Sequence, residues 1–195
     1  MLFAKRLKAG YTLVEVLVVV SILGILSAMG VAGLQQAVAN ARVKDAAINT
    51  AAFVERVANL SSQRNEVLCL RIASGDPQRL FVVRDKGTRD CESPNEGIID
   101  EFTIDAPAKF IANSEASSGC PTTMRDWIGN EAKVPFKPRI GLAATPPEGG
   151  ICIQYGGRDV YGAVRKDKNK NRVVPMWKVG NDRTSNNNWN NWTEL

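Results

Sequence analysis

Residues 11–34, YTLVEVLVVVSILGILSAMGVAGL, form a continuous apolar run whose one charged side chain is Glu15. The run is longer than the ~20 residues that a helix needs to cross the hydrocarbon core of a bilayer. Its other polar groups are hydroxyls, which a helix can satisfy against its own carbonyls. This segment therefore predicts a membrane-spanning helix.

The ten residues before this run, MLFAKRLKAG, are basic. They contain Lys5, Arg6 and Lys8 and no acidic residue. Because basic residues that flank a membrane helix stay on the cytoplasmic side, the N-terminus is predicted to be cytoplasmic. The large part of the chain that follows the helix is then predicted to lie outside the cytoplasm.

A secretory signal peptide has the same basic start and apolar run, and the small residues at 28–30 and 31–33 would suit a signal peptidase. Glu15 argues against this interpretation, because a carboxylate inside a membrane helix costs roughly 2.5–3.5 kcal/mol and usually has a partner. The next basic residue after the first ten is Arg42. A partner for Glu15 is therefore not found within the apolar run.

Residues 10–16, GYTLVEV, resemble the cleavage and methylation motif of type IV prepilins. In that family an inner-membrane prepilin peptidase cuts after the glycine, here Gly10, and methylates the new N-terminal amine, here that of Tyr11. Tyr11 stands where the family most often has phenylalanine, which is also aromatic. Glu15 becomes the fifth residue of the mature chain, as it is in the family.

The resemblance implies that Glu15 acts in assembly. In a filament of parallel helices, its carboxylate would accept the charged N-terminal amine of a neighbouring subunit. The alternative is that Glu15 reaches toward the headgroups from the start of the helix. The implied partners are other pilin or pseudopilin subunits, the prepilin peptidase, the assembly platform and the bacterial inner membrane. A single-pass chain with a periplasmic head, later part of an extracytoplasmic filament, is the implied location.

Length and composition favour one anchor helix followed by one globular domain. The chain has 195 residues, of which 44% are hydrophobic and 23% are charged. The formal net charge is +5, but removal of the leader takes away three basic residues and leaves 22 basic against 20 acidic side chains. The mature chain is thus close to neutral, and its charge alone does not indicate nucleic-acid binding.

The chain contains no histidine. This excludes Ser/His/Asp and Cys/His catalysis and removes the commonest zinc ligand. We therefore expect a non-enzymatic protein without a cofactor or a metal site.

Four cysteines lie downstream of the apolar run, at Cys69, Cys91, Cys120 and Cys152. Their even number, wide spacing and oxidising compartment predict two disulfides. A metal site built from all four thiolates is the alternative, although the chain has no C-x-x-C pair. Of the three connectivities, Cys91 with Cys120 and Cys69 with Cys152 is the expected one. It joins the two cysteines of turn-rich stretches and the two of strand-like stretches.

The helical pattern continues through residues 35–64, and no proline occurs between Met1 and Asp76. Apolar side chains recur there at steps of three and four residues, which predicts an amphipathic helix with one buried face. The members of this stripe are Val43, Ala47, Ala51, Val54 and Ala58. One helix from about residue 12 to about residue 62 is therefore expected.

Short β-rich runs separated by turn residues follow this helix. Strands are predicted at 67–72, 80–84, 98–104, 109–112, 140–143, 151–155, 160–165 and 172–179, with a helical turn at 122–127. Short connections favour antiparallel pairing, so the expected fold is α+β, a long helix packed against an antiparallel head. The predicted parts are a leader (1–10), a membrane or filament-core helix (11–34), its amphipathic continuation (35–64), the head (65–180) and a polar tail (181–195).

The head resembles those of minor pilins and pseudopilins, in particular the H-type subunit of type II secretion and its type IV pilus counterpart. The runs that carry this resemblance are VLCLRI (67–72), RLFVVRD (79–85) and ICIQYGGRDVYGAVRKD (151–167). The resemblance implies a low-copy structural subunit that primes or decorates a filament.

A basic stretch, RKDKNKNR at 165–172, precedes three tryptophans at 177, 189 and 192. Basic residues beside aromatic ones bind DNA through phosphate contacts and base stacking. The candidate DNA contacts are Arg165, Lys166, Lys168, Lys170 and Arg172. A solvated hairpin loop and a polar tail are the alternative interpretation.

Three functions are therefore compatible with the sequence. The first is a structural subunit of a pilus or a secretion pseudopilus, without enzymatic activity. The second is a minor pilin that binds DNA during DNA uptake. The third is a single-pass, membrane-anchored binding domain that does not polymerise.

Overall fold

The computed structural model describes residues 10–85, 91, 97–111, 119–121, 127–128, 135–138, 148–166, 172–180 and 189–195. Its main element is the helix α1, Leu13–Arg64, which confirms the predicted continuous helix. The contacts divide the chain into two compact units on either side of the bond between Val38 and Ala39. We call residues 10–38 the first unit and residues 39–195 the second unit.

The end of α1 is closed by a backbone motif centred on Asn65. This residue has a positive φ of 55°. The N–H of Glu66 donates to the carbonyl of Ser61, and the N–H of Asn65 donates to that of Ser62. These two bonds are the Schellman pattern, in which asparagine is one of the few residues besides glycine that tolerates the left-handed position.

In the first unit, every residue from Tyr11 to Gln35 is exposed. These residues are nearly all apolar, so this length of α1 has an apolar surface around its whole circumference. Among the described residues, α1 is the one helix that is long and apolar enough to cross a membrane. A helix that is hydrophobic on all sides requires a membrane or other protein around it.

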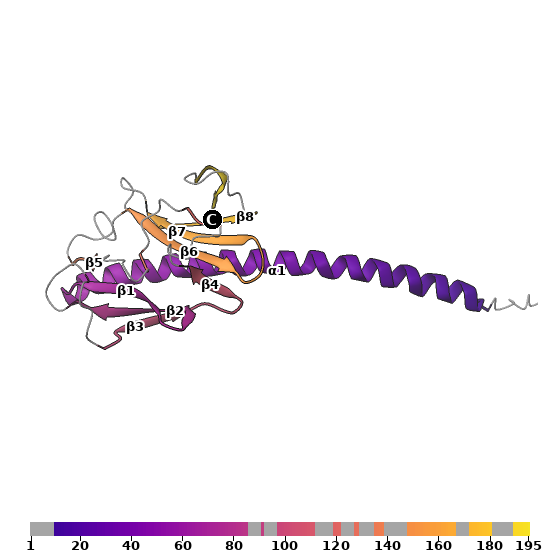
Figure 1. Ribbon diagram of the computed structural model, residues 1–195, viewed down its shortest axis with the longest axis horizontal. Helices are drawn as coiled ribbons and strands as arrows, with labels where there is room; N and C mark the ends of the chain where they lie inside the picture. The colour runs from indigo at the N-terminus through magenta and orange to yellow at the C-terminus, as the bar shows by residue number, and fades with distance from the viewer. Residues whose placement is uncertain are drawn as a thin grey trace, which may run out of the picture. The chain divides into compact units, whose positions relative to one another are not determined.

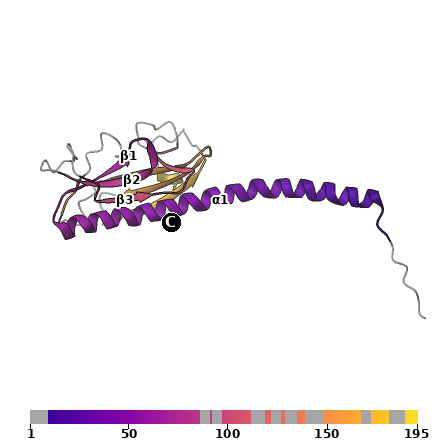
Figure 2. The same ribbon diagram turned by 90° about the horizontal axis from the view of Figure 1, so that it is seen from below.

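The second unit consists of two antiparallel sheets and the remainder of α1. The first sheet has the order β3-β2-β1-β5, and the second has the order β4-β6-β7-β8-β9. Both lie on the same side of the C-terminal half of α1 (Figures 1 and 2). The strands are β1 (Leu68–Ala73), β2 (Asp76–Arg84), β3 (Asp100–Thr103), β4 (Ala108–Ile111), β5 (Pro135–Phe136), β6 (Gly149–Tyr155), β7 (Val160–Lys166), β8 (Val174–Val179) and β9 (Thr193–Glu194).

The predicted apolar stripe of the helix is confirmed. All five of its members are buried under the two sheets, as are Phe53 and Val57 on the same face. An aromatic chain then joins three elements of the second unit. The ring of Phe53 on α1 stacks on Phe102 of β3 at 5.0 Å, and Phe102 meets Phe110 of β4 at 6.4 Å. The helix and both sheets therefore share one core, and the predicted α+β class is confirmed.

Most of the predicted strands coincide with observed ones. The strand predicted at 140–143 lies outside the described residues. Of the helical turn predicted at 122–127, only residue 127 is described. Strands β5 and β9 were not predicted, because two residues give no periodic signal and their extended form depends on the strand beside them. β5 pairs with β1, and β9 pairs with β8.

Two disulfides are present, as predicted, but the predicted connectivity is wrong. The bonds join Cys69 to Cys91 and Cys120 to Cys152. Cys69 lies on β1 in one sheet and Cys152 lies on β6 in the other. Each strand cysteine therefore bonds to a cysteine in a loop beside its own sheet, at Cα–Cα distances of 5.8 and 6.2 Å.

Each disulfide should stabilise the second unit substantially. The bonds close loops with sequence separations of 22 and 32 residues. In the chain-entropy model, loops of this length correspond to roughly 3–4 kcal/mol each. Replacement of Cys69 and Cys91 together by serine, or of Cys120 and Cys152 together, should lower the free energy of unfolding by about this amount in denaturant titrations. A peptide map under non-reducing conditions that linked Cys69 to Cys152 would contradict the connectivity.

Gly162 on β7 allows this strand to approach α1 closely. A Cβ atom at this position would lie 2.9 Å from Cγ1 of Val43 and 3.1 Å from its carbonyl oxygen. Gly162→Ala should therefore force the strand away from the helix and cost about 1–3 kcal/mol of stability. Gly97→Ala is the matched control, because its Cβ would have no atom within 4 Å. Equal unfolding midpoints for the two variants would show that stability does not require the close approach of β7 to α1 at Gly162.

Candidate processing and assembly site

The N-terminus of α1 is organised by Thr12. Its side-chain Oγ1 accepts a hydrogen bond from the backbone N–H of Glu15 at 3.2 Å, and its carbonyl accepts from the N–H of Val16 at 3.2 Å. Thr12 is thus the N-cap, and Glu15 is the third helical residue. This threonine-to-glutamate spacing is that of a capping box, a local sequence signal for the start of a helix.

The bond between Gly10 and Tyr11 lies before the helix begins. Both residues have no regular secondary structure, and Tyr11 is 81% exposed. A peptidase requires an accessible and extended chain, which a helix does not offer. Because Thr12 caps the helix at this point, the predicted cleavage bond lies just outside its first turn.

Glu15 lies in the first turn of α1 and is exposed. A carboxylate is favourable at this end of a helix, because the unpaired N–H groups carry partial positive charge. Within the described part of the chain, no ion pair involves Glu15. The hydroxyl of Ser21, further along, donates to the carbonyl of Leu17 at 2.8 Å, as expected for a polar group in a membrane helix. Glu15 is thus the one charged side chain of the apolar run 11–34, and among the described residues it has no ion-pair partner.

Comparison with known families identifies the same residues. Residues 5–31 match the family described as the prokaryotic N-terminal methylation motif. The match includes Gly10, Tyr11 and Glu15, and it supports a type IV pilin-like chain. The fold, a long apolar N-terminal helix with antiparallel sheets packed on its second half, is pilin-like as well. Comparison of the chain with curated proteins and with solved structures gives no match.

This motif agrees with a structural subunit rather than an enzyme. It also implies assembly with other pilin-like subunits and processing by a prepilin peptidase. The apolar helix and the motif together are consistent with anchoring in a membrane.

The residues predicted to contact DNA do not form one basic surface in the described part of the chain. Lys166 is 2% exposed, and this burial lowers the pKa of its ammonium while the carboxylate of Glu148 opposes the change. Arg165 lies 4.6 Å from the ring centre of Trp189, and Arg172 lies 3.7 Å from the carboxylate of Glu194. Lys168 and Lys170 lie outside the described residues.

The tryptophans near this stretch are also engaged within the chain. The ammonium of Lys44 lies 3.7 Å from the ring centre of Trp177, and Lys178 lies 5.2 Å from that of Trp192. Trp192 is buried against β8 and beside the disulfide of Cys120. Because cations of the chain occupy these ring faces, the described tryptophans do not form an open platform for stacking bases.

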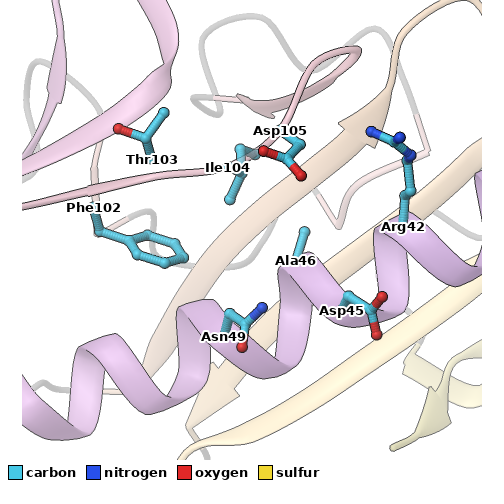
Figure 3. A pocket seen from close by; sticks show the side chains of 8 residues that line it. All are labelled: Arg42, Asp45, Ala46, Asn49, Phe102, Thr103, Ile104 and Asp105. Atoms are coloured by element: carbon cyan, nitrogen blue, oxygen red, sulfur yellow. The ribbon is translucent and has the colours of Figure 1, made fainter.

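A pocket of about 230 Å³ lies between α1 and the segment that follows β3 (Figure 3). Arg42 on its rim donates to the carbonyl of Ala106 at 3.2 Å, which ties the helix to the link between β3 and β4. No group of three metal-binding side chains occurs among the described residues, here or elsewhere. The residues that line the pocket are Arg42, Asp45, Ala46, Asn49, Phe102, Thr103, Ile104 and Asp105.

Proposed function

We propose that this chain is a minor pilin or pseudopilin, a structural subunit of a type IV pilus or of a type II secretion pseudopilus. A prepilin peptidase cuts it after Gly10 and methylates the amine of Tyr11. The observation that carries this proposal is the methylation motif at residues 5–31. The motif overlaps the start of α1 at Leu13, and the part of α1 in the first unit has an apolar surface on all sides.

Before assembly, the proposed location is the bacterial inner membrane, with residues 11–34 as the membrane span. Lys5, Arg6 and Lys8 hold the N-terminus in the cytoplasm, so the second unit lies in the periplasm. The two disulfides support this orientation, because such bonds form and persist in oxidising compartments.

In the filament, Glu15 accepts the N-terminal amine of Tyr11 from a neighbouring subunit. Two features support this role. Glu15 has no ion-pair partner within the described chain, and Tyr11 directly precedes the N-cap Thr12, so both lie at the same end of the helix. A buried ion pair is stable when both charges lose water together. The apolar surface of the first unit then packs against the same surface of other subunits, which replaces the lipid.

The assignment to the minor, H-type group rests on the resemblance of three runs in the head. These runs form β1, β2 and the β6–β7 hairpin, which are central strands of the two sheets. The chain would then be a low-copy subunit that primes or decorates a filament. The burial of Lys166 and the engaged tryptophans do not favour a DNA-binding role, so we do not advance it.

Mass spectrometry of the N-terminus tests the proposal. In the native host, the mature protein should begin at Tyr11 and carry one methyl group on its amine. Gly10→Leu should leave the ten-residue leader attached, because the peptidase requires the small residue at the cut. A native chain that begins after residue 28 would instead show cleavage by signal peptidase and would contradict the proposal.

A further inference from the structure

Within the second unit, α1 covers the strand β7. Val160 forms one apolar cluster with Val43 of the helix and is 1% exposed. A Cβ atom at Gly162 would lie 2.9 Å from Val43 and 3.4 Å from Ala47. Val164 is fully buried in the core that the helix shares with both sheets. One face of β7 is therefore buried against α1.

The same face of the sheet is exposed on β8 and β9. The register places Val179, Trp177 and Pro175 of β8 opposite the three covered residues of β7, so their side chains lie on the same face. Thr193 of β9 is opposite Trp177, and the N–H of Leu195 donates to the carbonyl of Pro175 at 3.0 Å. Val179 is 53% exposed and Leu195 is 41% exposed, while Trp177 and Pro175 are half-buried. The cover that α1 gives to this face thus ends between β7 and β8.

One edge of α1 lies beside this exposed part of the sheet. The ammonium of Lys44 is 3.7 Å from the ring centre of Trp177, which places this edge next to β8. Ile48 lies four residues after Lys44 on the same side of the helix and is 47% exposed. We use the name β8 face for Ile48, Pro175, Trp177, Val179, Thr193 and Leu195.

The β8 face gathers most of the exposed large apolar side chains of the second unit. Among the described residues of this unit, these side chains are Ile48, Ile98, Val179 and Leu195. Three of the four belong to the β8 face. Large apolar residues that are exposed together, rather than singly, indicate a surface that contacts another molecule.

Charged residues border the β8 face, but none is a member of it. Lys44 already has its ammonium over the ring of Trp177. An apolar partner can therefore cover this face without removing water from a charged member. The nearest charged residues are Lys44, Asp45 and Glu55 on α1, Arg158 and Asp159 before β7, and Lys178 and Glu194, which alternate onto the opposite face of the sheet.

The width of the exposed strands fits one helix. Because neighbouring strands lie about 4.8 Å apart, β8 and β9 extend the sheet about 10 Å beyond β7. The axes of packed helices are about 8–10 Å apart, so a second helix beside α1 would lie over β8 and β9. Ala41 and Ala52 are exposed on the same side of α1 as Ile48, and their small side chains permit a close approach.

We propose that the β8 face receives the apolar N-terminal helix of a neighbouring pilin-like subunit in the filament. Residues 13–34 of this chain are such a helix, apolar on all sides and in need of protein around it outside the membrane. One side of the helix can contact other apolar helices while another side covers the β8 face. This inference rests on the proposed function, because it requires assembly, and it adds which surface of the second unit takes part.

Photocrosslinking in filaments of the native host tests this contact. The photoreactive residue p-benzoylphenylalanine replaces Val179 or Ile48, so that one variant remains informative if the other misfolds. In the matched control it replaces Ile98, which is also 53% exposed but precedes β3 in the other sheet. Mass spectrometry identifies the crosslinked peptides. The N-terminus of the chain and its fraction in sheared filaments are measured in the same samples.

The label at Val179 or Ile48 should crosslink to the apolar N-terminal run of another pilin-like subunit, and the label at Ile98 should not. Val179→Glu should lower the fraction in filaments about tenfold, because an unpaired carboxylate would be buried, whereas Ile98→Glu should not change it. Crosslinks only to lipid or to a folded head, or equal crosslinks from Ile98, would overturn the inference. If the chain begins at Tyr11 and enters filaments in that case, the inference alone fails. A chain that keeps its leader and is absent from filaments removes the proposed function as well.

Discussion

Glu15→Ala should remove the chain from assembled filaments while its second unit remains folded. Without the carboxylate, the amine of Tyr11 from a neighbouring subunit would be buried among apolar side chains with no partner. Removal of one member of a buried ion pair costs roughly 3–5 kcal/mol, which corresponds to more than a hundredfold in an equilibrium constant. The fraction of the protein in sheared filaments, compared with that in membranes, is the measurement.

The charge of Glu15, rather than its size, should determine this loss. Glu15→Gln retains the shape and should behave as Glu15→Ala does, whereas Glu15→Asp should retain part of the incorporation. Ser21→Ala is the matched control, since it removes a polar group from the same helix whose hydroxyl is already satisfied by Leu17. If Glu15→Ala enters filaments normally, the chain is better described as a membrane-anchored domain that does not polymerise through this residue.

Phe110→Ala should cause one of the largest losses of stability available in the second unit. Phe110 is 1% exposed on β4, and its ring meets Phe102 of β3, which stacks on Phe53 of α1. Truncation of a buried phenylalanine costs about 3–5 kcal/mol, because the transfer energy is lost and a cavity remains. This is a large part of the ~5–15 kcal/mol that stabilises a typical domain.

Denaturant titration of the full chain in detergent, followed by near-ultraviolet circular dichroism, measures this loss. Phe110→Leu fills most of the same volume and should cost clearly less. Ile98→Ala is the control at a large apolar residue that is exposed, and it should change the free energy of unfolding by less than about 0.5 kcal/mol. A similar small change for Phe110→Ala would show that the aromatic chain does not join the helix to both sheets.

The methylation motif was recognisable in the sequence because its signal is local. A basic leader, a glycine, an aromatic residue and a carboxylate at fixed spacing within the first fifteen residues require no knowledge of the rest of the fold. The same spacing contains the capping box of Thr12 and Glu15, which explains why the helix starts next to the predicted cleavage bond. By contrast, the pocket at Arg42 combines about two turns of α1 with the end of β3 and the link after it, more than fifty residues later. Nothing in either stretch alone indicates this pocket.

The DNA hypothesis shows what a local signal cannot decide. A basic stretch near tryptophans has the composition of a nucleic-acid surface, yet Lys166 points into the second unit and Trp192 packs beside a disulfide. Strand β7 alternates its side chains between two faces, and the sheet's position determines which of these faces water. Arg165 and Lys166, although adjacent in sequence, therefore lie on opposite faces of β7.

The sequence by itself determined the helix, its division into an apolar and an amphipathic half, and most of the strands. These features depend on side chains within one or two turns of each other, and their spacing is visible in the chain. Only the tertiary structure decided which cysteines are joined, where the two-residue strands β5 and β9 form, and why β7 needs glycine at position 162. Those features depend on which distant segments become neighbours, and that choice is made by the packing of the whole core.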